Sequence, residues 1–432
     1  MKGALLSVEA ALHRLLSLTA PLQAETAPLM EAVGRVLREP LAATHTQPPF
    51  DASQMDGYAV ALSQGSRSEE AVATAGLAAA GTTFTLRGSS RAGSGAPSEL
   101  TLRPGEAIRI FTGAPLPPAA PGAALTVALQ EDATVAEADG TAPRVSFREA
   151  LRPGRWIRPR GLDFQAGDVL LAAPRRLSAE DVTLAAAAGA PSLMVTRRPR
   201  VALLALGDEL REPGAPLGPD QIYASGQYGV AALLAQAGAD IRLPPIVPDA
   251  LDALIAALRA ASDVDLLVTL GGASAGDHDL ARPAFEALGV TPEFHRIAMR
   301  PGKPLMAGRL GETIAVGLPG NPVSALVCAR VFLLPTLAAM EGAPPAAHAV
   351  GGGAWLSARL ATDLGPGGPR AHYMRAVFEA AADGGADRRV RPFEDQDSSR
   401  QALLSAADCL VLRPAGDPPR PAGAPIDCLP LR

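Results

Sequence analysis

Between residues 199 and 340, apolar strand-like runs alternate with helix-like runs. Three buried-strand patterns, VALLAL at 201–206, DLLVTL at 265–270 and TIAVGL at 313–318, each lead into a glycine-containing turn. Strands that alternate with helices predict a parallel sheet covered by helices. Ligands of such sheets bind beyond the carboxyl ends of the strands, so the turns after these runs are the first candidates for a site.

The rest of the chain follows other patterns. Residues 7–45 have helical spacing in two pieces, the first capped by Ser7 and the second at about 29–37. From about 58 to 150, and again after 341, short apolar runs alternate with Gly and Pro, which predicts strands. Between them, SAEDVTLAAAAGA predicts a capped helix that ends at Gly189.

Charge and cysteine content exclude several classes of function. The net charge of −5 and the 4% of aromatic residues argue against nonspecific binding of nucleic acid or of an anionic membrane. The three cysteines are widely spaced, which predicts free thiols in the cytoplasm and no disulfide framework. The amino-terminal residues have the pattern of an amphipathic helix rather than a signal peptide, and we expect no membrane span.

The turn after the first strand carries two carboxylates, Asp208 and Glu209, behind Gly207. Carboxylates at the end of a strand can bind a hard cation such as Mg²⁺ through oxygen. The alternative is structural, because Asp208 in such a turn can cap a following helix.

The turn after the second strand, residues 271–279, is rich in glycine. Gly271 and Gly272 allow backbone N–H groups to approach an anion, and Ser274 adds a hydroxyl donor. Asp277 and Asp279 could bind the metal ion that neutralises this anion. Most short glycine turns are only turns, so this pattern is weak evidence by itself.

The turn after the third strand contains Pro319, Gly320, Asn321 and Pro322. Asn321 at the N-cap and Pro322 at the first helical position explain the start of a helix completely. An anion at the positive end of that helix remains an open alternative.

A basic segment, FHRIAMRPGKPLMAG, lies between the second and third turns and carries Arg296, Arg300 and Lys303. If the chain is extended there, Arg296 and Arg300 share a face, and together with the carboxylates they suit a polyanionic substrate with a metal ion. The alternative is a solvated basic strand. The six histidines lack the spacing of a catalytic zinc site, and neither a GxSxG elbow nor a Walker A loop occurs.

On these residues the chain resembles the molybdopterin molybdenumtransferases, the family of bacterial MoeA and the gephyrin E domain. The resemblance extends from Ser7 to about Arg413. Its motifs, in order, are PPFDASQMDGYAV, IRIFTGAPLP, LQED, IRPRGLDFQAGD, LGDEL, IYASGQY, GGASAGDHD, RIAMRPGKPLMAG and GLPGNPVSA.

The resemblance implies a multidomain fold, in which an inserted β-rich domain interrupts a helical domain. A parallel-sheet α/β domain similar to pterin-adenylating enzymes and a small C-terminal β domain follow. The implied boundaries are 1–45 with 152–198 for the discontinuous N-terminal domain, 46–151 for the insertion, 199–340 for the α/β domain and 341–432 for the C-terminal domain. It also implies a homodimer, with a site between the α/β domain of one subunit and the insertion of the other.

The implied reaction inserts molybdate into adenylated molybdopterin and releases AMP with the help of Mg²⁺. The residues at matching motif positions imply a catalytic set of Asp56, Thr112, Asp163, Glu209, Asp249 and Asp279, of which the last three would also hold the metal. The implied substrate-binding set is Gly271, Gly272, Ser274, Arg296, Arg300, Lys303, Pro319, Gly320, Asn321 and Pro322. Arginine stands at 296 and 300 where many members carry lysine, which keeps the charge but changes how an oxyanion is held.

Two other functions stay open on the sequence. The α/β domain alone would also suit the preceding step, adenylation of molybdopterin, although the additional domains argue against it. A non-enzymatic dimeric scaffold is the second alternative, and the intact acidic set argues against that. Possible partners are the adenylating enzyme and apo-molybdoenzymes or their chaperones, and the choice between molybdate and tungstate is open.

Overall fold

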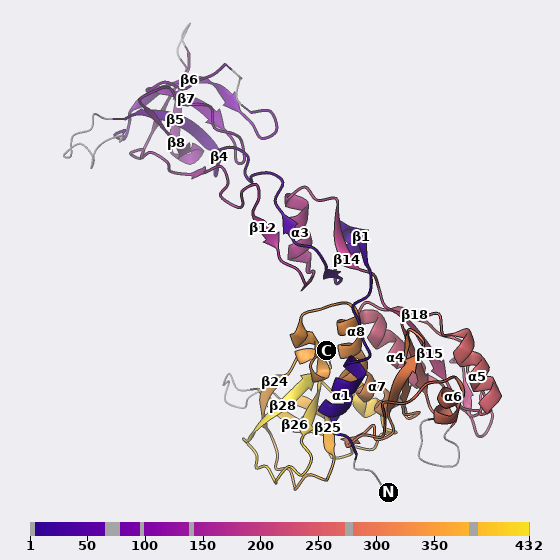
Figure 1. Cartoon of the computed structure of the whole chain (residues 1–432). Coiled ribbons are helices and arrows are strands. Elements are labelled where there is room, and N and C mark those ends of the chain that lie inside the picture. The colour runs from indigo at the N-terminus through magenta and orange to yellow at the C-terminus, as the bar shows by residue number, and fades with distance from the viewer. Residues whose placement is uncertain are drawn as a thin grey trace. The chain divides into compact units, whose positions relative to one another are not determined.

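The structure is a computed structural model that describes residues 5–64, 78–95, 99–137, 142–272, 280–379 and 388–431 (Figure 1). The chain forms two compact units. Unit 1 comprises residues 1–39, 172–182 and 192–432, and unit 2 comprises residues 40–171 and 183–191. The four-domain division expected from the sequence stays a prediction.

Unit 1 contains the α/β layer that the sequence predicted. Its six-stranded sheet has the order β18-β15-β19-β23-β22-β20. Four strands are parallel: β15 (Arg200–Ala205), β18 (Asp240–Arg242), β19 (Leu266–Leu270) and β23 (Thr313–Leu318). Two antiparallel strands, β22 (Met306–Leu310) and β20 (Phe294–His295), extend one edge, so the sheet is mixed rather than purely parallel.

Helices cover both faces of this sheet because successive strand residues point to opposite sides. Leu203 packs into one apolar cluster and Leu204 into the other. Figure 1 shows α4 and α7 on one side of the sheet and α5 and α6 on the other. The bounds are α4 (Ser225–Gln236), α5 (Leu251–Ala260), α6 (Ala281–Ala287) and α7 (Pro322–Cys328).

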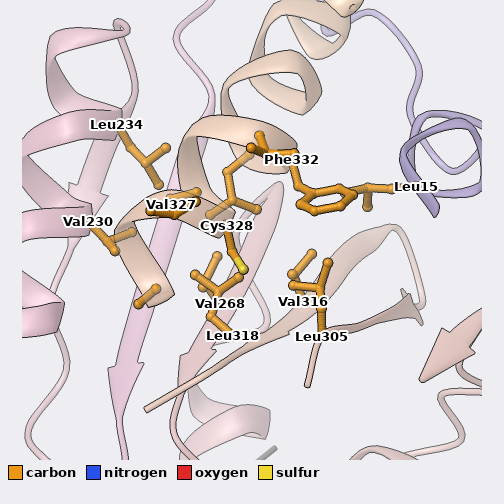
Figure 2. Packing of buried hydrophobic residues seen from close by; sticks show 14 of the residues in the cluster. Leu15, Val230, Leu234, Val268, Leu305, Val316, Leu318, Val327, Cys328 and Phe332 are labelled. Atoms are coloured by element: carbon orange, nitrogen blue, oxygen red, sulfur yellow. The ribbon is translucent and has the colours of Figure 1, made fainter. Parts of the chain in front are cut away.

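The helix after β23 is long and apolar. It runs from α7 through a π-helical turn, η2 (Ala329–Leu333), into α8 (Leu334–Met340). By length and composition Pro322–Met340 could cross a membrane, but 83% of its most apolar window is buried inside the protein. Figure 2 shows Cys328 and Phe332 from this helix facing the sheet residues Val268 and Val316. Burial in the core therefore accounts for the apolar composition.

Of the two helices predicted near the amino terminus, the first is confirmed and the second is not. Helix α1 (Val8–Leu16) begins at Ser7, whose Oγ accepts the Ala10 N–H at 3.1 Å, and Leu15 lies beside Phe332 (Figure 2). The second helix, expected at about 29–37, is wrong: α2 covers only Leu29–Ala32.

Strand pairing replaces the rest of that second helix. A four-stranded sheet of order β1-β14-β2-β13 takes up the segment, with bounds β1 (Ala24–Pro28), β14 (Ser192–Thr196), β2 (Val36–Leu37) and β13 (Arg175–Arg176). Gly34, at φ +77°, turns the chain between α2 and β2, and residue 195 bonds across to residue 37. The region is therefore not the helical domain that was expected.

Unit 2 is β-rich, as the sequence predicted for the insertion. Its main sheet has the order β8-β5-β7-β6-β10-β9. The strands are β5 (Gly57–Ser63), β6 (Thr83–Ser90), β7 (Glu106–Ile110), β8 (Ala123–Leu129), β9 (Ala133–Ala136) and β10 (Arg144–Phe147). Two short pairs, β4 (Ala52–Ser53) with β11 (Ile157–Arg158) and β3 (Leu41–Ala42) with β12 (Val169–Leu171), join the sheet to the rest of the unit.

The predicted helix before residue 189 is present as α3 (Ala179–Ala187). Ser178 Oγ accepts the Asp181 N–H at 3.2 Å, and Asp181 Oδ2 accepts the Ser178 N–H at 2.9 Å. This reciprocal pair caps the helix, and Gly189 at φ +78° follows its end, as expected.

The predicted C-terminal β structure is also confirmed. A six-stranded sheet has the order β21-β25-β26-β24-β28-β27, and β25 also pairs with β27, so five strands close into a barrel. The strands are β21 (Met299–Arg300), β24 (Leu356–Leu360), β25 (Ala371–Glu379), β26 (Arg389–Pro392), β27 (Cys409–Arg413) and β28 (Pro425–Pro430). The cysteines Cys328, Cys409 and Cys428 are buried free thiols.

Candidate functional site

Three turns of unit 1 meet at one cavity. The carboxyl ends of β15, β19 and β23 lie at the same edge of the sheet, because the three strands are parallel neighbours. A cavity of about 460 Å³ opens at this edge. The predicted residues in its wall are Glu209, Asp249, Gly271, Gly272, Pro319, Gly320, Asn321 and Pro322.

Glycine is required where the turns approach one another. Gly271 has φ +99°, and a Cβ there would lie 2.8 Å from the carbonyl oxygen of Leu206. A Cβ on Gly320 would lie 3.2 Å from the Cα of Gly271, tighter than an ordinary contact. The second and third turns are therefore in backbone contact, which leaves main-chain groups rather than side chains at the floor of the cavity.

The acidic side of the cavity comes from two turns that bond to each other. Leu206 bridges to Val247 in a parallel pair, which places Asp249 beside the Gly207–Glu209 turn. The Asp249 N–H donates to Asp208 Oδ1 at 3.2 Å, and the Asp208 N–H approaches Asp249 Oδ2 at 3.5 Å. Glu209 and Asp249 are both exposed and both line the cavity.

The structural alternative for Asp208 is wrong. The chain continues from this turn into β16 (Leu210–Arg211), which pairs with β17 (Ile222–Tyr223), and the next helix begins only at Ser225. Asp208 thus caps no helix. Its carboxylate holds the neighbouring Asp249 turn in place instead.

The structural reading of Asn321 is confirmed. Its side chain accepts the Val323 N–H at 3.2 Å at the start of α7, and Pro322 follows at the first turn. Since Asn321 also lines the cavity, the capped helix presents its amino end there.

Two predicted residues, Ser274 and Asp279, lie outside the described residues, together with Asp277. Within the described ranges, no group of three or more His, Cys, Asp or Glu side chains is arranged to hold a metal ion. Glu209 and Asp249 do supply hard oxygen donors at one cavity. Mg²⁺ is commonly held by one or two carboxylates together with substrate phosphates, so these two residues fit that ion.

The basic segment is not one extended strand. Arg296 has a left-handed backbone at φ +82°, which ends β20, and Arg300 lies on the separate strand β21. The even-spacing argument that placed both arginines on one face is therefore wrong. Arg296 Nε is buried without a hydrogen-bond partner, Arg300 and Lys303 are exposed, and Pro304 reaches the wall of the cavity.

The structure adds basic residues that the sequence analysis missed. Strand β21 pairs with β25, so Arg300 lies opposite His372, and Arg370 Nη1 donates to the carbonyl of Met299 at 3.4 Å. Burial, together with the positive charges of Arg300, Arg413 and Arg370, lowers the pKa of His372 to about 4. No local pattern marks these residues, because about seventy positions separate them from Arg300 along the chain.

The remaining predicted residues belong to unit 2. Thr112 donates to Asp56 Oδ1 through its N–H at 2.7 Å and its hydroxyl at 2.8 Å. These two hydrogen bonds lower the pKa of the Asp56 carboxyl. Asp163 is exposed in the turn before β12, and its backbone N–H donates to the carbonyl of Gln47 at 3.0 Å.

A larger cavity of about 870 Å³ lies at the opposite edge of the α/β sheet, and it contains none of the predicted residues. Its main charges neutralise each other: Arg197 donates to both oxygens of Asp265 at 2.7 Å. The smaller cavity is better prepared for an anionic ligand, because its glycine turns, helix end and carboxylates converge without such pairing.

Comparison with known families covers most of the chain. Residues 6–189 match the model described as "MoeA N-terminal region (domain I and II)". Residues 202–339 match the "Probable molybdopterin binding domain", and residues 357–431 match the "MoeA C-terminal region (domain IV)".

Individual proteins give the same result. Molybdopterin molybdenumtransferase 2 of Mycobacterium tuberculosis is 38% identical over 327 residues, which are 74% of this chain and 76% of that protein. Molybdopterin molybdenumtransferase of Bacillus subtilis is 29% identical over 95% of this chain and 90% of its own. The solved MoeA protein of Pyrococcus horikoshii has a TM-score of 0.75 and 26% identity, and the match covers 99% of this chain and 100% of that one.

Proposed function

Since the chain belongs to the MoeA family of molybdopterin molybdenumtransferases, we propose that it transfers molybdenum at the cavity formed by β15, β19 and β23. The chain is an enzyme of molybdenum cofactor biosynthesis. In the proposed reaction, adenylated molybdopterin and molybdate are the substrates, and the products are molybdenum cofactor and AMP. The observation that carries this assignment is the convergence of Glu209, Asp249 and three glycine-containing turns on one cavity.

The cavity suits cleavage of the bond between two phosphates. Charge builds on the AMP phosphate as it leaves, and groups already positioned to neutralise that charge lower the barrier. Backbone amides at Gly271 and Gly272 and the amino end of α7 are proposed to hold the phosphates. No covalent nucleophile is required for this step.

The carboxylates Glu209 and Asp249 are proposed to bind Mg²⁺, with Asp279 as a third ligand. When bound, the ion would supply positive charge next to the phosphates. The reciprocal contacts between Asp208 and Asp249 support this proposal, because they fix the positions of two acidic turns relative to each other. Without a cation, these carboxylates would repel the anionic substrate.

The basic side of the site is proposed to receive molybdate. Arg300 is exposed, lies opposite His372 in the sheet, and has Arg370 nearby. This local excess of positive charge suits a dianion, and the planar guanidinium group can donate two hydrogen bonds to one oxyanion. Arg296 and Lys303 are proposed to contribute from the same segment.

The residues of unit 2 are proposed to act in a homodimer, where Asp56, Thr112 and Asp163 of one subunit complete the site of the other. The Thr112 hydrogen bonds hold the Asp56 carboxylate in one position and in its charged form. The adenylating enzyme and apo-molybdoenzymes or their chaperones remain proposed partners. The free thiols are compatible with a cytoplasmic location, which is also proposed.

The experiment that tests this function is AMP release from adenylated molybdopterin by the purified protein with Mg²⁺, with and without molybdate. Molybdate-dependent release is expected. Consumption of ATP with bare molybdopterin would indicate the adenylation step instead. A folded protein that binds the pterin but releases no AMP would indicate a scaffold.

A further inference from the structure

An arginine outside the proposed site lies in an apolar setting, and within the described ranges it has no carboxylate partner. Arg330 belongs to the π-helical turn η2 and is half-buried. Its polar contact in the described part of the chain is a hydrogen bond from Nη2 to the carbonyl of Leu431 at 2.9 Å. Burial lowers the pKa of Arg330, and no acidic side chain of the described residues forms an ion pair with it.

This guanidinium faces a cavity of about 230 Å³. The cavity lies between the long helix of the α/β layer and α9 (Gln401–Ala406) of the C-terminal region. Apart from Arg330 and Ser405, its wall is aliphatic and consists of Leu326, Val327, Leu404, Ala407 and Leu431. It shares no residue with the cavity that contains Glu209 and Asp249.

The backbone around Arg330 departs from a regular helix. Pro335 lacks an N–H and cannot continue the α-helical ladder, and the chain adopts a π-helical turn over the residues before it. Single π-helical turns occur frequently at functional sites. Here the turn places Arg330, the charged residue of an otherwise apolar helix, at the wall of the cavity.

We propose that this cavity is a second ligand site, which binds a carboxylate attached to a short aliphatic group. The carboxylate would pair with Arg330, and the hydrocarbon would lie against the leucine and valine side chains. A charged donor in an apolar wall favours such a ligand, because the carboxylate of the ligand pairs with the guanidinium while its hydrocarbon is removed from water. A polyanion fits poorly, since one guanidinium faces an aliphatic wall.

The test uses hexanoate as the probe, titrated calorimetrically into the full-length protein, with hexylamine and hexanol as probes of the same tail. Saturable binding of one hexanoate per chain is expected, with hexylamine and hexanol at least about tenfold weaker. Molybdate at saturating concentration should leave hexanoate binding unchanged, because the two sites share no residue. Saturable binding of hexylamine as tight as that of hexanoate, or no hexanoate binding, overturns the proposal.

Variants locate the site. Arg330→Gln is expected to weaken hexanoate at least about tenfold, and Arg330→Lys should recover part of that loss. Leu404→Trp fills the cavity without replacing the guanidinium and should abolish hexanoate binding. The matched control is Arg259→Gln, which changes an exposed arginine of α5. Unaltered affinity in both Arg330→Gln and Leu404→Trp overturns the assignment.

Two sources could supply this chemistry: a free small acid or the carboxyl terminus of a polypeptide that ends in an apolar residue. To distinguish the two sources, acetylated leucine with a free carboxylate and the corresponding amide are each used as competitors of hexanoate. Competition by the acid form, but not by the amide, assigns the site to a polypeptide terminus. Hexanoate binding without such competition assigns it to small acids.

Discussion

At the scale of single residues, the proposed site depends on two exposed carboxylates whose positions are fixed by backbone contacts. Asp249 is held through its N–H by Asp208, and Glu209 follows in the same turn as Asp208. Exposed acidic side chains contribute little to folding, so their removal should affect chemistry rather than stability. The effect of removing these carboxylates on activity can therefore be measured without a change in the stability of the fold.

Asp249→Asn is expected to lower molybdate-dependent AMP release by about 100-fold, since loss of an outer-shell partner alone costs about 10- to 100-fold at metal sites. The thermal midpoint should stay unchanged. Asp252→Asn is the matched control, because Asp252 is also exposed and lies three positions along the chain, on α5. Equal activity of Asp249→Asn and Asp252→Asn would remove Asp249 from the site.

Thr112→Val tests the Asp56 pair. The variant loses the hydroxyl bond and keeps the backbone bond, so the pKa of Asp56 should rise part of the way toward its usual value. A carboxyl with a lowered folded pKa stabilises the fold above its unfolded pKa and loses that contribution as the pH falls through the folded pKa. NMR titration of the Asp56 carboxyl measures the change, with Thr82→Val as control. An unchanged titration would show that the hydroxyl bond is not formed in solution.

His372 reports on the proposed molybdate site. Its pKa, lowered from 6.5 to about 4, leaves the ring neutral in the folded protein at pH 7. The contribution of His372 to the free energy of unfolding is therefore fully present above pH 6.5. It is lost as the pH falls from 6.5 to about 4, because only the unfolded chain takes up the proton in this range. A dianion beside Arg300 should raise the pKa of His372, as NMR titration with and without molybdate would show.

Arg300→Glu should raise the pKa of His372 without molybdate and weaken molybdate binding, because the neighbouring positive charge that lowers this pKa most becomes negative. Arg103→Glu in unit 2 is the control. If molybdate leaves the histidine titration unaltered in the unmodified protein, the anion site lies elsewhere.

At the scale of elements, the site is an assembly of turns that approach one another closely at glycines. Gly271→Ala should lower the free energy of unfolding by about 1–3 kcal/mol, because the residue needs φ +99° and the new Cβ meets the Leu206 carbonyl. Gly368→Ala is the control, since nothing lies within 4 Å of its added Cβ. Denaturant unfolding measures both, and equal stability would contradict the close approach of the turns.

Local patterns predicted those elements whose signals are local. The parallel strands, the Ser7 and Asn321 caps and the glycine at the end of α3 follow from apolar periodicity and capping chemistry. The helix expected at about 29–37 failed because pairing with β14, far along the chain, outweighs helical spacing.

The residues of the candidate site were likewise predicted only in part. Glu209, Asp249 and the glycine turns could be found from strand ends and motif resemblance. The backbone turn at Arg296 was not predictable, because a positive φ at arginine has no sequence signal. Arg370 and His372 were missed because only the β21–β25 pairing brings them to Arg300.

At the scale of the whole molecule, the proposal of a shared site can be tested by mixing subunits. Asp56→Asn and Asp249→Asn homodimers should each be nearly inactive. If each site uses both subunits, random exchange should restore about a quarter of the activity, because half of the dimers then carry one intact site of two. A mixture of the unmodified protein with either variant alone is the control. No recovery after proven exchange would place all residues of a site in one chain.

One cavity is proposed to couple loss of AMP to gain of molybdenum. The most direct measurement follows AMP release and pterin-bound molybdenum together, in the unmodified protein and in Asp249→Asn. We expect one AMP per molybdenum incorporated, dependence of both on molybdate, and loss of both in the variant. AMP release that ignores molybdate, or molybdenum incorporation that survives in Asp249→Asn, would contradict it.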